Sequence, residues 1–188
     1  MAAAGMMTAT GVLDLAILGV VSEGATTCET IVGVVKRIGG GKFRPTAEVI
    51  GNRIGALLEA GCLTPLEAGG WPGRVELSVA GRSAIQRLLH GSTLAPGEAL
   101  GAVCQTLRVC LLELLPPELR REVLGEAIAA NRRELAHARA ALERCPCQCR
   151  FVERCLARDV QRWEAELLWL EDLDVDLAVW PARRPHEA

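Results

Sequence analysis

The chain has 188 residues, a formal net charge of −2, and a composition that is 50% hydrophobic and 23% charged. This composition excludes a disordered chain, and the length suits one large domain or two small ones. Only 3% of the residues are aromatic. A core must therefore be built mainly from Leu, Val, Ile and Ala, which favours packed helices over an all-β fold.

The N-terminal sequence MAAAGMMTATGVLDLAILGVV is apolar, but it lacks a positively charged leader and contains Asp14. We therefore expect neither a secretory signal nor a membrane partner, since no apolar run reaches the roughly 18 residues that span a bilayer. The expected location is cytoplasmic, where the eight cysteines would remain thiols rather than form lasting disulfides.

Two helices are predicted before residue 40. The first, Gly11 to Glu23, is almost entirely apolar and ends at Gly24, which is typical of a helix inside a small bundle. Thr26 or Thr27 can cap a second helix, whose apolar stripe is Ile31, Val34, Val35 and Ile38.

The segment PTAEVIGNRIGALLEAG, residues 45–61, predicts a third helix that Thr46 caps and Gly61 ends. Its apolar residues recur at helical spacing and predict one core face, made of Val49, Ile50, Ile54, Leu57 and Leu58. The opposite face is expected to carry Glu48, Asn52, Arg53, Ala56 and Glu59, and Lys42-Phe43-Arg44 leads into the helix.

Two short strands, 62–64 and 74–77, are predicted around a turn-rich loop, and Ser78 can cap a fourth helix over 79–90. Three helices followed by a hairpin describe a winged helix, in which the third helix enters the DNA major groove and the loop reaches the backbone. The predicted fold is mainly α with a small β-hairpin wing, and its first domain spans 11–90. The expected DNA contacts are Lys42, Arg44, Thr46, Asn52, Arg53 and Arg74.

Three segments resemble signature blocks of PadR-family transcriptional regulators: LDLAILGVVSEG (13–24), RPTAEVIGNRIGALLEAGCL (44–63) and GRVELSVAGRSAIQRLL (73–89). In that family the recognition helix closes on Leu-x-x-x-Gly, here 57–61, and a strand runs into a Thr/Ser-x-x-Gly-Arg turn, here 78–82. The chain departs from the family at Gly51, where an aromatic residue is usual, and at Val75, which stands nearest the usual Tyr of the wing. The resemblance implies a DNA-binding regulator.

The second half predicts three helices, over 98–115, 118–144 and 150 to about 173, after a turn-rich boundary at 91–97. They form a second helical domain, 98–175. The resemblance implies that these helices wrap around a partner subunit, and residues 158–173 are similar to the end of that dimerisation region. The dimer contacts expected on the last helix are Leu156, Trp163, Leu167 and Leu170; the alternative for this apolar stripe is an ordinary monomer core.

A cysteine cluster lies between the last two predicted helices, at Cys145, Cys147, Cys149 and Cys155. Thiolates are soft ligands for zinc, copper(I), iron–sulfur clusters or metalloids, and the cluster has three arginines beside it. A metal or redox site and simple packing at a helix turn are both open. The other cysteines, Cys28, Cys62, Cys104 and Cys110, fall in or beside apolar stretches and are expected to pack as small apolar residues.

No enzymatic motif stands out: the chain has no phosphate-binding loop, no nucleophile elbow and no zinc-protease motif. We therefore expect a non-enzymatic, homodimeric regulator, a repressor that binds palindromic double-stranded DNA. If the cysteine cluster is a functional site rather than packing, this regulator would respond to a metal or redox signal. The alternative is a winged-helix adaptor that binds proteins and not DNA. The sequence leaves the operator, the regulated genes and the effector open.

Overall fold

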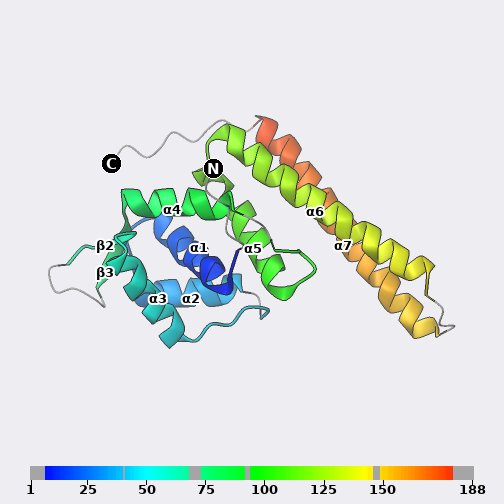
Figure 1. The fold of residues 1–188 in the computed structure, drawn as a ribbon, viewed down its shortest axis with the longest axis horizontal. Helices are drawn as coiled ribbons and strands as arrows, with labels where there is room; N and C mark the ends of the chain where they lie inside the picture. The colour runs from blue at the N-terminus through cyan, green and yellow to red at the C-terminus, as the bar shows by residue number, and fades with distance from the viewer. Residues whose placement is uncertain (1–6, 40, 68–72, 92–93, 146–148, 180–188) are drawn as a thin grey trace. The chain divides into compact units, whose positions relative to one another are not determined.

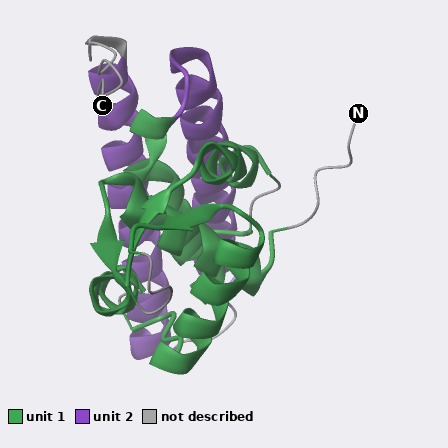
Figure 2. Ribbon diagram, turned by 90° about the vertical axis from the view of Figure 1, so that its left-hand side faces the viewer, with its two compact units in different colours: residues 1–114 green, residues 115–188 purple. Residues whose placement is uncertain are grey.

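The computed structural model describes residues 7–39, 41–67, 73–91, 94–145 and 149–179. The chain divides into two compact units, residues 1–114 and 115–188, which are coloured separately in Figure 2. Each unit has its own arrangement of helices and is described by itself.

The first unit is built around its first helix, which is nearly all apolar. Eight residues of this helix are buried, including Leu15, Ile17 and Leu18, because the helix contacts four others and one strand. The helices of this unit are α1 (Ala9–Ser22), α2 (Cys28–Ile38), α3 (Ala47–Glu59), α4 (Val79–Leu89) and α5 (Ala99–Cys110), followed by the 3-10 turn η1 (Leu112–Leu114) (Figure 1).

Four of these helices begin at a hydroxyl side chain that accepts a hydrogen bond from the backbone N–H three residues later. Thr46 accepts from Val49 N at 3.2 Å, and Ser78 accepts from Gly81 N at 2.9 Å. Thr8 and Thr27 begin α1 and α2 in the same way. The predicted caps at Thr46 and Ser78 are thereby confirmed, since the hydroxyl satisfies one of the amides that a helix start leaves free.

The sheet has three antiparallel strands in the order β1 (Thr26–Thr27), β3 (Arg74–Leu77) and β2 (Leu63–Pro65). The sequence predicted only two strands, because a two-residue strand carries no readable alternation. Thr26 pairs with Val75, and Leu63 pairs with Leu77. Val75 and Leu63 are buried and anchor the sheet to the helices. Helix, strand, two helices and a hairpin make a winged helix, as predicted.

The start of the second half differs from the prediction. The expected helix over 98–115 is the shorter α5 followed by η1, and α5 contacts α1 and α2. The compact first unit therefore runs to residue 114 and includes α5. The assignment of 11–90 and 98–175 as functional domains stays a prediction.

The second unit consists of two long helices, α6 (Pro117–Glu143) and α7 (Arg150–Val179), packed along each other. Two ion pairs join them at 2.7 Å, Arg132 with Glu171 and Arg139 with Glu164. From the first pair to the second, the residue number rises by seven on α6 and falls by seven on α7. The two helices are therefore antiparallel. Within the described residues, no helix has both the length and the hydropathy to cross a membrane.

Candidate nucleic-acid interface

The helix α3 is fixed by one buried face. Ile50, Ile54 and Leu57 are buried against the elements that α3 contacts, which include α1, α2 and β2. Val49 was predicted on this core face, but it is 48% exposed, because it lies at the edge of the buried stripe. The packing leaves the other side of α3 toward solvent.

The outward stripe of α3 carries small and acidic residues. Glu48, Asn52 and Glu59 are exposed, and Gly51 and Gly55 lie between them. A Cβ added at either glycine would meet nothing within 4 Å. The fold of the first unit therefore does not need glycine there, and the stripe presents a nearly bare backbone with Asn52 as its central amide.

Arg53 is placed differently from the prediction, which put it on the outward face. Its Nε donates to Asp14 Oδ1 at 2.6 Å and its Nη2 donates to Asp14 Oδ2 at 2.7 Å, forming a bidentate ion pair between α3 and α1. This hydrogen bonding raises the pKa of the Arg53 guanidinium. Its contact with DNA stays a prediction, and its observed role is to fix α3 on α1.

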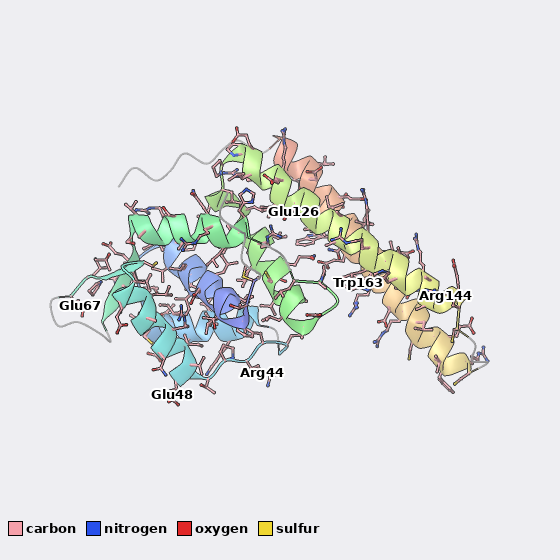
Figure 3. All side chains as sticks on the ribbon, viewed as in Figure 1. Arg44, Glu48, Glu67, Glu126, Arg144 and Trp163 are labelled. Carbon is pink, nitrogen blue, oxygen red and sulfur yellow. The ribbon has the colours of Figure 1, made fainter. Side chains whose placement is uncertain are left out.

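Two exposed cations lie on the connection between α2 and α3. Lys42 and Arg44 are exposed there, and no side-chain hydrogen bond or ion pair joins either to another described residue. Figure 3 shows Arg44 on this connection and Glu48 near the first turn of α3. Thr46, one of the predicted contacts, has its oxygen occupied as the cap of α3, while its O–H can still donate.

The wing contributes Arg74, the first residue of β3. Its Nη2 donates to the backbone oxygen of Ala25 at 3.1 Å, although the side chain remains exposed. This bond ties the base of the wing to the segment before β1. Residues 68–72 of the predicted loop lie outside the described part of the chain.

The predicted cysteine cluster is only partly described. Cys145 follows α6 and is half-buried, Cys149 precedes α7 and is exposed, and Cys155 is exposed on α7. Cys147 lies outside the described residues. Among the residues that the structure does describe, no three His, Cys, Asp or Glu side chains are grouped so that they could hold a metal ion.

The four cysteines expected to pack do not all do so. Cys104 is buried, and its burial raises the pKa of the thiol, while the positive charge of Arg108 acts in the opposite direction. Cys28 and Cys62 are half-buried, but Cys110 is exposed because it lies at the end of α5 and faces away from the core.

The four residues predicted for dimerisation are largely covered inside the single chain. Leu170 has 0% and Trp163 has 8% of its surface exposed, and Leu156 and Leu167 are half-buried. The large apolar side chains that α7 leaves exposed are Phe151, Val152, Leu168, Trp169 and Val175.

Comparison with known proteins gives structural similarity only. No protein-family model matches the chain, and no curated protein matches it. The chain is similar to Bacillus subtilis PadR, with a TM-score of 0.40 and 15% identity over 90% of this chain and 96% of that one.

Two further solved structures show the same degree of similarity. For PadR from that organism in complex with operator DNA, the TM-score is 0.40 at 16% identity, with 88% of this chain and 99% of that chain covered. For the Vibrio cholerae virulence activator AphA, the TM-score is 0.38 at 20% identity, with 89% and 98% covered. Scores at this level decide neither family nor function.

Proposed function

We propose that this protein is a PadR-like transcriptional regulator that binds double-stranded DNA through its winged helix. The observation that carries the proposal is the placement of α3, whose one face is buried while its outward stripe is exposed and nearly free of bulky side chains. A helix held in this way can enter a major groove of DNA, and the hairpin of β2 and β3 can reach the DNA backbone.

The proposed contacts divide into two kinds. Lys42, Arg44 and the Thr46 hydroxyl meet phosphates, since they stand at the entry to α3, and Arg74 meets the backbone from the wing. Asn52 reads a base edge, because its amide can donate and accept together. Gly51 and Gly55 let the α3 backbone come close to the bases.

A DNA-selection experiment with a random duplex library tests this function. The purified protein is expected to enrich a palindromic motif, which is then used in gel-shift assays at several salt concentrations. The double variant Lys42→Gln/Arg44→Gln should weaken binding to all sequences and reduce the salt slope of the dimer by about 4, or about 1 for each of the two phosphate contacts that each protomer loses. The matched variant Arg82→Gln/Arg87→Gln removes two exposed cations of α4 and should leave binding unchanged.

The glycines of α3 allow a sharper test of which face meets DNA. Gly33 of α2, like Gly51 and Gly55, has open space where a Cβ would lie. Alanine at each position should therefore be tolerated by the fold. Gly51→Ala and Gly55→Ala should weaken operator binding while Gly33→Ala does not; equal binding by all three variants would contradict the docking of α3.

The proposed regulator is a homodimer that acts as a repressor. The exposed apolar side chains of α7, rather than the buried Leu170 and Trp163, supply the proposed contact with a second copy, because exposed side chains such as Leu168 and Trp169 gain from being covered. Trp169→Asp should then reduce the mass measured by light scattering to that of a monomer, whereas Gln161→Asp on exposed surface should not.

The second part of the proposal is a response to a soft metal or to oxidation at Cys145, Cys147, Cys149 and Cys155. The support is chemical: Cys149 and Cys155 are exposed thiols near the connection of α6 and α7. Elemental analysis, and gel shifts with and without reductant, test it. If the purified protein contains no metal and its DNA binding is the same with and without reductant, the proposed metal or redox response is refuted, while the proposed DNA binding is not.

The alternative function is a protein-interaction adaptor. It is favoured by the outward stripe of α3, which carries Glu48 and Glu59 and only one neutral polar side chain, Asn52, in the described structure. A library selection that returns no motif would support the adaptor over the regulator.

A further inference from the structure

An acidic side chain stands on the outward stripe of α3, close to the start of the helix. Glu48 is the second residue of α3, and its side chain is exposed (Figure 3). No hydrogen bond or ion pair joins its carboxylate to another described residue. The carboxylate can therefore meet a partner from outside the chain.

Glu48 and Asn52 belong to one row of the helix surface. They are four residues apart, so their side chains are neighbours, separated by about 6 Å along the helix axis. Both are exposed, whereas the opposite side of α3 is buried through Ile50, Ile54 and Leu57. The row that faces away from the core thus carries one anion and one amide side by side.

An anion on this row opposes DNA binding in general. DNA carries one negative charge about every 1.7 Å along its axis, so phosphates repel Glu48 while they attract Lys42 and Arg44. An acidic residue in the first turn also interacts favourably with the helix dipole. That structural role would make no distinction between DNA sequences, and this difference allows the two roles to be separated by experiment.

The bases differ in what they offer to a carboxylate in the major groove. Cytosine presents its N4 amino group as a donor, whereas the N6 amino group of adenine lies beside the acceptor N7. Guanine and thymine present only acceptors there. An ionised carboxylate accepts hydrogen bonds and cannot donate one. It is therefore suited best to cytosine and is repelled by guanine and thymine.

We propose that Glu48 determines sequence specificity by accepting a hydrogen bond from the N4 amino group of a cytosine in each half of the operator. This inference rests on the proposed function, the docking of α3 in the major groove. Asn52 reads a second base of the same half-site, since about 6 Å along the helix corresponds to about two base-pair steps of about 3.4 Å. Glu48 thus discriminates between sequences and does not raise affinity for all of them.

Library selection with the full chain and two variants tests the assignment. The wild type should enrich cytosine at one position of each half-site. Glu48→Gln should enrich adenine at that position, because a glutamine amide pairs with N6 and N7 of adenine. Glu59→Gln removes the same charge from the exposed last residue of α3. This control should select the wild-type motif, since the N-terminal residues of a recognition helix contact the bases.

Gel shifts at fixed salt measure the size of the effect. Replacing the selected cytosine with thymine should weaken binding by the wild type about tenfold, and binding by Glu48→Gln much less. Duplexes that lack the motif should bind Glu48→Gln more tightly than the wild type, because the repulsion from phosphates is reduced. Thermal unfolding followed by circular dichroism confirms that each variant is folded.

The outcomes separate this inference from the proposed function. If the wild type and Glu48→Gln select the same base at every position, the inference is overturned and the proposed function stands. If Glu59→Gln changes the same position as Glu48→Gln, charge alone explains the change and the inference is again overturned. If none of the three proteins selects a motif, the proposed function fails, and the role of Glu48 fails with it.

Discussion

Three glycines of the first unit lie against backbone, whereas Gly125 of the second unit does not. A Cβ at Gly39, Gly81 or Gly101 of the first unit would overlap a backbone carbonyl oxygen, those of Phe43, Cys62 and Ala95 respectively. In the second unit, Gly125 of α6 has nothing within 4 Å of such a Cβ. Backbone therefore packs on backbone at these three positions of the first unit, although its Gly33, Gly51 and Gly55 are open, whereas the α6–α7 pair is joined by side chains and exposed ion pairs. The close backbone contacts of the first unit leave little room for a shift of its elements, whereas α6 and α7 can shift more easily against each other.

The largest effect is expected from Gly81→Ala. Its methyl group would overlap the Cys62 oxygen and crowd Leu77, so either α4 or the strand β2 must move. We expect a loss of about 3 kcal/mol in the free energy of unfolding, measured by urea denaturation. Gly125→Ala is the control and should raise stability slightly, since alanine suits a helix better than glycine. Equal unfolding of Gly81→Ala and the wild type would remove the contrast between the units.

A cavity in the second unit should cost less. Leu170 is completely buried, and its truncation to alanine is expected to cost about 2 kcal/mol, the low end for a buried leucine, because two helices can close partly over the gap. Leu168→Ala, at a position 62% exposed, is the matched control and should change little. If Leu170→Ala lowered the free energy of unfolding by about 5 kcal/mol, the α6–α7 pair would be unable to close over the gap and would be as rigid as the winged helix.

One ion pair in each unit allows a comparison of the two units with smaller expected energies. Arg53 and Asp14 are 32% and 15% exposed, while Arg132 and Glu171 of the second unit are 62% and 42% exposed. A double-mutant cycle with alanine should give a coupling of about 1 to 2 kcal/mol for the first pair and less than about 1 kcal/mol for the second. Urea denaturation of the four single variants and the two doubles measures both couplings, and a larger value for Arg132–Glu171 would reverse the comparison.

The smallest effect is expected at alkaline pH. The pKa of the Cys104 thiol is raised by burial in the folded chain, so the folded state holds this proton more tightly than the unfolded state does. The resulting stability is complete below the unfolded pKa of about 8.5 and is lost as the pH rises through the folded pKa. The free energy of unfolding, measured from pH 7 to pH 10, should therefore decrease more steeply with pH in the wild type than in Cys104→Ala. Parallel curves would contradict this.

The helices and their caps could be predicted from the sequence because the signals are local. Periodic apolar residues and the hydroxyls of Thr46 and Ser78 act within one helical turn. The order of three helices and two short strands predicted a winged helix, and the PadR resemblance implied the same arrangement.

The remaining features depend on distant contacts. The strand β1 forms because Thr26 pairs with Val75, which lies 49 residues later in the chain. Arg53 turns toward Asp14, 39 residues away, and a lone carboxylate in an apolar helix was the only sequence signal of that partner. Val49 met the helical spacing of a core residue, yet the loop before α3 leaves a pocket over it.

The buried Arg108 decides how the winged helix can be studied in isolation. From α5, its Nε and Nη2 donate to the Leu89 backbone oxygen at 3.0 and 2.7 Å, at the end of α4. A fragment that stops at His90 would lose this guanidinium and uncover the side of α1 on which α5 packs. A fragment that ends at Leu114 keeps both. Truncations that aim at the shortest autonomously folding DNA-binding piece should therefore end after η1 and not at the turn-rich segment that precedes α5.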